Sequence, residues 1–239
     1  MRVVLFGGSG YVGSRIASQV IARGHDLVIV SRNPPVGSSI FVKADIYNPE
    51  SYSECLANAD AVIHCVGSFS HSQDYKKIIS EPLSPCTPLK LLKSRLGGSN
   101  PLDDNLFKIN TLSAQTVAHA FDVTIKTSTK KPFVYLSAQE SLLTSQDYIE
   151  SKRRAEQLIA EQPHLRSVFL RPGIIYDPLK RDITSFRDLV GVGLGLVDRL
   201  DIAPRTPIET VAAAAVDACE DEGVEGIISS EVLDKFSTL

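Results

Sequence analysis

The chain has 239 residues, enough for one large hydrophobic core with a small attachment but not for two equal domains. Hydrophobic residues make up 43% of it and charged residues 22%, which is typical of soluble globular proteins and excludes a disordered, collagen-like or coiled-coil chain. The 25 basic and 28 acidic residues leave a net charge of −3, so we expect no nucleic-acid partner, and a local site has to hold any polyanion.

The first predicted strand, Val3–Phe6, leads directly into a glycine-rich turn and a helix predicted over Tyr11–Arg23. The glycines are spaced G-x-x-G-x-x-G, which lets backbone amides approach a pyrophosphate at the positively polarised N-terminus of the helix. A tight turn without a ligand is the alternative. The residues predicted to contact a dinucleotide here are Gly7, Gly10, Tyr11, Val12 and Gly13.

The second predicted strand, Leu27–Val30, is followed by Ser31 and Arg32. An acidic side chain at this place binds the ribose 2′-hydroxyl of NAD, whereas an arginine suits the 2′-phosphate of NADP. The sequence therefore predicts that Ser31 and Arg32 bind the cofactor and that NADP (NADPH) is favoured over NAD. A solvated surface arginine is the alternative.

Two further apolar strands are predicted over Ile40–Val42 and Ala61–Ile63, with a helix between them. Asp45 follows the first of these strands and is a candidate to bind adenine, with a turn or N-cap role as the alternative. Gly67 follows the second, where a cofactor can approach the backbone. The alternation of strands and helices predicts an α/β fold with a parallel sheet covered by helices on both faces.

Residues 67–104 interrupt this alternation, because prolines and glycines are scattered there among polar and basic residues. We interpret this region as an inserted loop, and loops of such length usually cover a site or bind a partner. Its basic residues suit an anionic substrate or acidic lipid, and a solvated loop is the alternative.

Helical periodicity returns around Asn110, and a strand predicted over Phe133–Leu136 ends at Ser137. A helix predicted over 147–161 then carries Tyr148 and Lys152, four residues apart and therefore on one face. A lysine ammonium lowers the pKa of a neighbouring phenol and makes it an acid/base group, and a serine hydroxyl can bind the same substrate oxygen. The alternatives are a strand-end cap, a polar helix-flank residue and an exposed Tyr/Lys pair.

The strand predicted over Ser167–Leu170 ends in R-P-G, where Pro172 is expected to shape the nicotinamide pocket. We divide the chain into an NAD(P)-binding domain, residues 1–175, and a small substrate-side subdomain, residues 176–239, packed on the first. The longest apolar run, Leu189–Val197, is far shorter than the roughly 18–20 residues that cross a bilayer, so any membrane contact is predicted to be peripheral.

The N-terminus shows no secretory signal, which favours an intracellular chain with reduced thiols. The four cysteines lack the close spacing of a zinc site, and the five histidines lack the spacing of a metal-dependent hydrolase. We therefore expect no metal, and we place His64 in the core.

The order of these motifs resembles the extended and atypical short-chain dehydrogenase/reductase superfamily, with F-G-G-S-G-Y-V-G, S-R, A-D-I, S, Y-I-E-S-K and R-P-G in turn. More narrowly, the stretches that resemble the fungal mitochondrial short-chain dehydrogenase-like proteins associated with coenzyme Q (ubiquinone) biosynthesis are A-D-I-Y-N-P-E-S-Y, V-I-H-C-V-G, Y-I-E-S-K-R-R-A-E and R-P-G-I-I-Y-D. The likeness extends over nearly the whole chain.

This resemblance implies a doubly wound Rossmann fold, an NAD(P) cofactor, and a location at the matrix side of the mitochondrial inner membrane with other ubiquinone-biosynthesis proteins. The catalytic roles fall on Asn110, Ser137, Tyr148 and Lys152, and Lys152 also positions the ribose. Two features depart from the superfamily pattern: Phe6 replaces a threonine, and H-C-V-G replaces the usual motif after the fourth strand.

Two functions remain open at this stage. The first is an oxidoreductase that acts on a carbonyl or hydroxyl group of a quinone-like small molecule. The second is a non-catalytic nucleotide-binding subunit that stabilises or regulates the ubiquinone biosynthetic complex, as in atypical relatives whose dinucleotide is structural. An RNA-associated role ranks last because the net charge is negative.

Overall fold

A computed structural model describes residues 1–33, 40–69, 104–141, 144–179 and 204–236 of the chain. Its main sheet has seven parallel strands in the order β3-β2-β1-β4-β5-β6-β9. The strands are β1 (Arg2–Phe6), β2 (Asp26–Ser31), β3 (Phe41–Lys43), β4 (Ala61–His64), β5 (Lys131–Leu136), β6 (Leu165–Arg171) and β9 (Gly226–Ser229). This is the predicted Rossmann fold, and the strand order reverses between β1 and β4, where ligands bind in sheets of this kind.

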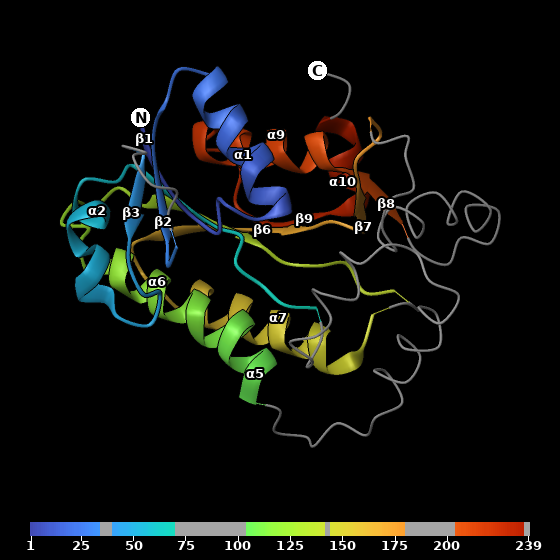
Figure 1. Ribbon diagram of the computed structural model, residues 1–239, viewed down its shortest axis with the longest axis horizontal. Helices are drawn as coiled ribbons and strands as arrows, with labels where there is room; N and C mark the ends of the chain where they lie inside the picture. The colour runs from blue at the N-terminus through green and yellow to red at the C-terminus, as the bar shows by residue number, and fades with distance from the viewer. Residues whose placement is uncertain (34–39, 70–103, 142–143, 180–203, 237–239) are drawn as a thin grey trace.

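Helices cover both faces of the sheet (Figure 1). One face carries α1 (Tyr11–Ala22), α9 (Ile208–Glu220) and α10 (Ser230–Phe236). The other face carries the short turn η1 (Pro49–Tyr52), α2 (Ser53–Ala57), α6 (Ser113–Asp122) and α7 (Gln146–Ala160). A single turn, α5 (Asp104–Leu106), and the π-helical segment η2 (Phe107–Leu112) lead into α6.

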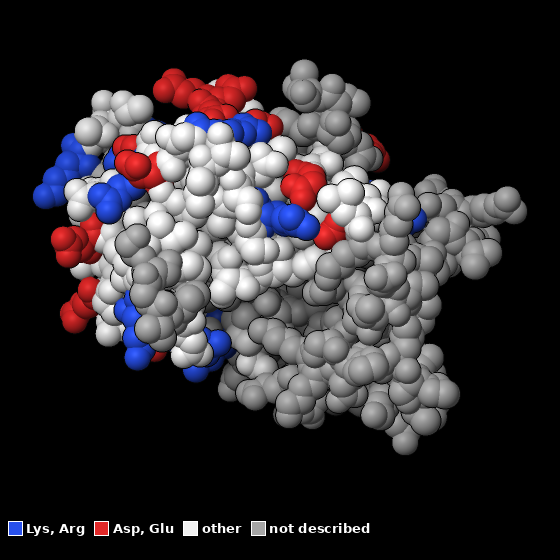
Figure 2. Space-filling view, turned by 45° about the horizontal axis from the view of Figure 1, so that its top comes forward, with Lys and Arg blue, Asp and Glu red and all other residues white. Residues whose placement is uncertain are grey.

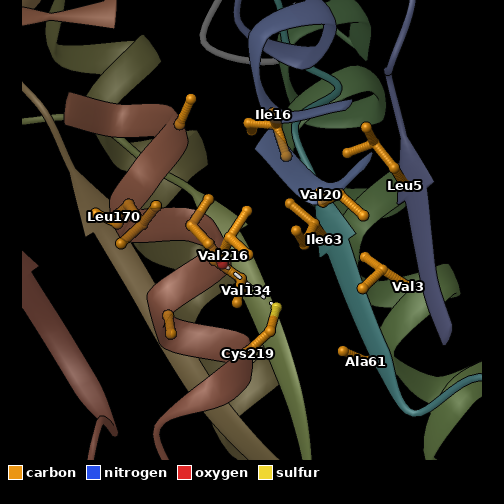
Figure 3. Packing of buried hydrophobic residues seen from close by; sticks show 14 of the residues in the cluster. Val3, Leu5, Ile16, Val20, Ala61, Ile63, Val134, Leu170, Val216 and Cys219 are labelled. Carbon is orange, nitrogen blue, oxygen red and sulfur yellow. Dashed lines mark hydrogen bonds between the residues drawn. The ribbon is translucent and has the colours of Figure 1, made fainter. Parts of the chain in front are cut away.

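Alternating side chains of the strands supply the two halves of the core. Val3 and Leu5 on β1 belong to the cluster beneath α1 and α9, whereas Val4 and Phe6 belong to the cluster on the side of α6 and α7. Figure 3 shows the first cluster, in which Val216 of α9 packs among side chains of the strands and α1. Burial of each large aliphatic side chain contributes about 1.5–3 kcal/mol, so this two-sided burial accounts for the nearly unbroken apolar strands of the sequence.

The last segment of the chain is part of the main sheet. Helix α9 packs against α1, and β9 pairs in parallel with β6. The predicted boundary at residue 175 therefore cuts through the sheet layer, because an apolar helix and strand from the last segment complete its core. A separate pair of strands, β7 (Ile174–Tyr176) and β8 (Arg205–Pro207), lies outside the main sheet.

The interior of the predicted inserted loop, residues 70–103, lies outside the described residues, as does the apolar run Leu189–Val197. Among the helices that the structure describes, none has both the length and the hydropathy of a membrane span. On the face drawn in Figure 2, acidic and basic side chains are interspersed, in keeping with the small net charge.

Candidate functional site

The glycine turn lies at the carboxyl end of β1, directly beside the end of β4. Gly7 has a φ of +89°, a conformation that side chains rarely adopt, and a Cβ there would lie 3.0 Å from the backbone of Cys65. The amide of Gly10 donates to the Gly7 carbonyl at 2.9 Å, which closes the turn. The turn is thus pressed against the neighbouring strand exit.

Gly13 brings helix α1 against this turn. A Cβ at Gly13 would lie only 2.1 Å from the Gly7 carbonyl oxygen, closer than any real contact. Gly10 caps the helix without a side-chain hydrogen bond, and no acidic side chain occupies the first helical turn. The first amides of α1, from Tyr11 and Val12 onward, have no acceptor within the helix, and the helix dipole favours an anion at this end.

The predicted 2′-phosphate site lies at the ends of β2 and β3. Arg32 is exposed just after β2, and Ser31 pairs in register with Lys43, a second exposed cation that the sequence analysis missed. The strand register is the signal that would have found it. Asp45 is also exposed, and its carboxylate accepts a hydrogen bond from the amide of Tyr47 at 3.1 Å, as in an Asx turn.

Lys152 is buried in the interior between α7, β4 and β5. Its Nζ donates to the carbonyl oxygen of Leu136 at 2.9 Å and lies 4.7 Å from the ring centre of Tyr135. Burial lowers the pKa of Lys152 to about 7, although Cys65 and Glu156 partly oppose this effect. The ammonium is therefore poised to change its charge near neutral pH.

Tyr148 lies one helical turn before Lys152, as the sequence predicted. Its ring centre is 5.9 Å from the Nζ of Lys152 and 4.9 Å from the ring centre of Phe69. Ser145 caps α7, because its hydroxyl accepts a hydrogen bond from the Tyr148 amide. The Tyr148 ring is half-buried, whereas Lys152 lies deeper beneath it.

Asn110 and Gly67 border the same place from the opposite side. The Asn110 side chain forms two hydrogen bonds with the backbone of Ser68, at 2.8 and 2.9 Å, and a third to the Ser151 hydroxyl at 3.0 Å. A Cβ at Gly67 would lie 3.0 Å from the Nζ of Lys152 and 3.2 Å from Oδ1 of Asn110. Gly67 thus leaves room for the lysine, and the π-helical segment that carries Asn110 is of a kind that often marks functional sites.

Ser137 is buried at the exit of β5, but its hydroxyl is directed to another partner. It donates to Glu156 at 2.5 Å, and Arg153 donates to both of these side chains, at 3.2 Å to Ser137 and 2.8 Å to Glu156. Arg171, at the end of β6, also binds Glu156. This charged cluster was not predicted from the sequence, although Glu156 follows Lys152 by four residues on the same helix face.

Pro172 follows β6, where its carbonyl accepts a hydrogen bond from the Gln139 amide at 2.8 Å. It therefore fixes the chain after β5 relative to β6. The structure thus places Asn110, Gly67, Tyr148 and Lys152 together, near the glycine turn. Ser31, Arg32 and Asp45 lie at the ends of β2 and β3, and Ser137 belongs to the Glu156 cluster.

His64 is fully buried at the end of β4, which confirms its predicted place in the core. Its Nε2 lies 3.2 Å from the hydroxyl of Ser113, and burial lowers its pKa to about 3. Within the part of the chain that the structure describes, no group of three or more His, Cys, Asp or Glu side chains is placed to hold a metal ion.

Residues 3–81 match the model of the NAD dependent epimerase/dehydratase family. The chain is 31% identical over 207 residues to MIOREX complex component 2 of Saccharomyces cerevisiae, and the match covers 74% of this chain and 73% of the yeast protein. It is 26% identical over 256 residues to an uncharacterised chloroplastic protein of Arabidopsis thaliana, covering 96% of this chain and 75% of the plant protein.

Two solved structures share the fold. The UDP-glucose 4-epimerase of Thermus thermophilus in complex with NAD has a TM-score of 0.64 at 18% identity and covers 100% of this chain and 83% of its own. The human epimerase family protein SDR39U1 with NADPH has a TM-score of 0.60 at 19% identity, covering 96% of this chain and 73% of its own.

Proposed function

The chain belongs to the short-chain dehydrogenase/reductase superfamily, in its NAD-dependent epimerase/dehydratase branch, and from this membership we propose that it binds a nicotinamide dinucleotide and transfers a hydride between it and a carbonyl or hydroxyl substrate. The observation that carries this proposal is the glycine turn. Gly7 and Gly13 allow a close approach of strand, turn and helix that any side chain would prevent. Such a cradle suits a pyrophosphate, so the residues present fit the cofactor.

Each part of the site has a role in this proposal. The α1 amides at Tyr11–Gly13 hold the pyrophosphate, Lys152 holds the ribose, and Pro172 borders the nicotinamide. The bound dinucleotide supplies or accepts the hydride. Tyr148 donates a proton to the substrate oxygen, or removes one from it, and the positive charge of Lys152 favours its phenolate form.

The test is to titrate the purified chain with NADPH and then to assay hydride transfer with Tyr148→Phe. We expect the variant to bind NADPH within about twofold of the wild type, because it loses no proposed nucleotide contact. We expect turnover to fall by about 100- to 10,000-fold, the usual contribution of a positioned acid/base. Tyr52→Phe is the control, since that hydroxyl binds the carbonyl of Ile46 outside the site. Unchanged turnover in Tyr148→Phe would refute the acid/base role.

We further propose that NADP is preferred over NAD. Arg32 and Lys43 place two cations at the carboxyl ends of β2 and β3. The end of β2 carries Ser31 and Arg32, where an NAD-binding protein would have an acidic residue. We expect Arg32→Ala to weaken NADPH binding by about 10- to 100-fold, since hydrogen bonds to charged groups contribute about 1.5–3 kcal/mol. NADH binding should change by less than about twofold. Equal wild-type affinities for NADPH and NADH would contradict the preference.

The finer assignment is ubiquinone biosynthesis at the matrix side of the mitochondrial inner membrane, with quinone-pathway intermediates as substrates and only peripheral membrane contact. The motif resemblance supports it, whereas the name of the yeast relative supports only a place in a protein complex. Deletion of the gene should lower cellular ubiquinone, and the tagged protein should fractionate with mitochondria. Normal ubiquinone content after deletion would refute this assignment.

A non-catalytic nucleotide-binding subunit of a protein assembly is the second candidate. The yeast relative is named as a complex component, and the Ser137 hydroxyl donates its hydrogen bond to Glu156. If this candidate is correct, Tyr148→Phe should support the pathway in cells as well as the wild type, whereas Gly13→Ala should not.

A further inference from the structure

A buried carboxylate lies one helical turn beyond Lys152 and is surrounded by cations. Glu156 accepts hydrogen bonds from Arg153 at 2.8 Å, from Arg171 at 3.0 Å, and from the Ser137 hydroxyl at 2.5 Å. A second bond joins Arg171 to the other carboxylate oxygen. Only 7% of the Glu156 side chain is exposed, against 26% for Arg153 and 21% for Arg171. An ion cluster so deeply buried is held in one geometry, because loss of Glu156 would leave two half-buried arginines without their carboxylate.

The same helix face holds three successive residues of the exit of β5. Lys152 donates to the carbonyl of Leu136 at 2.9 Å. Arg153 donates to the carbonyl of Ala138 at 2.9 Å and to the Ser137 hydroxyl at 3.2 Å. Glu156 receives the Ser137 hydroxyl. We call this group the strand-exit clamp, and its members are Ser137, Lys152, Arg153, Glu156 and Arg171.

The position of Glu156 along α7 separates it from the acid/base candidate. Tyr148 precedes Glu156 by eight residues, which is about 12 Å along a helix axis at 1.5 Å per residue. Ser137 is bound at the Glu156 end of this distance, whereas Lys152 lies midway. Lys152 is thus the member of the clamp that lies beside the reacting end of the site, 5.9 Å from the ring centre of Tyr148.

We propose that Glu156 is a positioning residue, which with Arg153 and Arg171 fixes the exit of β5 against α7 and thereby sets the depth and charge of Lys152, and that Ser137 serves this clamp instead of binding the substrate. The proposal rests on the proposed function, because it assigns Lys152 to the nucleotide. In this role Glu156 binds Ser137, Arg153 and Arg171 and acts on the nucleotide through Lys152, without contacting the substrate itself.

Two members of the clamp, Glu156 and Arg153, have opposite effects on the pKa of Lys152. Glu156 raises the pKa of Lys152 and Arg153 lowers it, whereas burial has the largest effect. The groups that face Lys152 or its partners are His64 and Cys65 at the end of β4, Tyr135 on β5, Tyr148, Arg153 and Glu156 on α7, and Arg171 on β6. Loss of Glu156 therefore favours the neutral amine, and loss of Arg153 favours the ammonium.

The experiment measures the dissociation constant for NADPH from about pH 6 to about pH 9, around the Lys152 titration, for the wild type, Glu156→Gln and Arg153→Gln. Affinity for the anionic nucleotide should fall as Lys152 loses its charge. The midpoint of this fall should move to lower pH in Glu156→Gln and to higher pH in Arg153→Gln, by up to about one unit, since a nearby opposite charge favours the ammonium and a like charge disfavours it. Glu156→Asp keeps the charge and should restore most of the wild-type midpoint.

Asp122→Asn is the matched control. Asp122 is a carboxylate of similar burial, 8% exposed, that binds His164 at the amino end of β6, far from the clamp. It should leave the midpoint unchanged. Circular dichroism establishes whether each variant is folded. If Glu156→Gln does not fold, the shift of the midpoint in Arg153→Gln tests the proposal, because in that variant Glu156 stays paired with Arg171.

Ser137 is tested by a double-mutant cycle on the same dissociation constant. If Ser137 acts through Glu156, adding Ser137→Ala to Glu156→Gln should raise the dissociation constant for NADPH by less than about twofold, because the effects of coupled residues are not additive. Additive losses would remove Ser137 from the clamp. Folded variants with the wild-type midpoint would overturn the positioning role alone, whereas a wild type that binds no NADPH would overturn the proposed function as well.

Discussion

At the scale of single residues, the site depends on glycines, which have no Cβ and therefore allow close backbone contacts. Gly13 has no Cβ, and this lets the first turn of α1 lie against the Gly7 carbonyl. The spacing of the glycines along the sequence was sufficient to predict this turn. The direction of the Ser137 hydroxyl was not predictable, because a buried hydroxyl binds whichever partner the packing supplies, and that partner is Glu156.

Gly13→Ala should weaken NADPH binding by more than about tenfold. Alanine at an ordinary helical position stabilises a protein by about 1 kcal/mol relative to glycine, but here its methyl group would lie 2.1 Å from a backbone oxygen, so the helix has to move off the turn. Isothermal titration calorimetry measures the affinity, and urea unfolding measures the stability.

Gly24→Ala, at the other end of α1, is the control for that prediction. Gly24 has a φ of +76° and no atom near a Cβ, so alanine there strains the backbone without obstructing the turn. It should lower the stability by about 1 kcal/mol and leave the affinity unchanged. Equal affinities in the two variants would contradict the role of Gly13.

At the scale of elements, the site is held by contacts between segments far apart in the sequence. The π-helical segment η2 carries Asn110, whose side chain binds the backbone of Ser68 after β4 and the hydroxyl of Ser151 on α7. Thr111 adds a hydrogen bond to the carbonyl of Ser151 at 2.7 Å. The sequence analysis assigned Asn110 to catalysis by resemblance. In the structure its side chain joins three elements around Lys152.

Asn110→Ala should lower both the stability and the affinity for NADPH. The change removes three hydrogen bonds that join η2 to the Ser68 backbone and to α7, and each hydrogen bond contributes about 0.5–1.5 kcal/mol. Urea unfolding checks the stability and fluorescence titration the affinity. Thr116→Ala on α6 is the control, because that exposed hydroxyl binds only the carbonyl of Leu112 within its own helical stretch. If Asn110→Ala lowers the stability and the affinity no more than Thr116→Ala does, Asn110 does not hold these elements together.

At the scale of the whole molecule, the two-sided sheet buries a titratable group in its core. His64 lies between the rings of Phe6 and Tyr135, and its Nδ1 has no hydrogen-bond partner among the described residues. Burial lowers the pKa of His64 to about 3, so the folded state keeps the ring neutral where the unfolded chain, with a pKa near 6.5, takes up a proton. This contribution to stability is complete above about pH 6.5 and is lost as the pH falls below it.

The free energy of unfolding should therefore fall by up to about 1.4 kcal/mol per pH unit between about pH 6.5 and about pH 5. Lys152, with a folded-state pKa of about 7, is mostly protonated in both states over this range and adds a smaller slope of the same sign at its upper end. Urea unfolding across this range should show a shallower slope for His64→Phe, with His119→Gln, at an exposed position, as the control. A nuclear magnetic resonance titration that protonates His64 near pH 6 would contradict the prediction even if the variant does not fold.

The parallel strands β1 to β6, the order of their elements and the residues of the glycine turn were predictable from the sequence alone. These features follow from local rules: two-sided burial makes strands apolar throughout, helices repeat their apolar residues every three to four positions, and only glycine permits the turn. The spacing of Tyr148 and Lys152 likewise follows from the helix itself.

The tertiary structure alone decided which groups meet across elements. It placed β9 in the main sheet and α9 on its face beside α1, set Lys43 beside Ser31, and bound Ser137 to Glu156. Such pairings depend on register and on the depth of each side chain below the surface, neither of which a single sequence encodes locally. The pKa of Lys152 is of the same kind, since the surrounding β4, β5 and α7 remove its water.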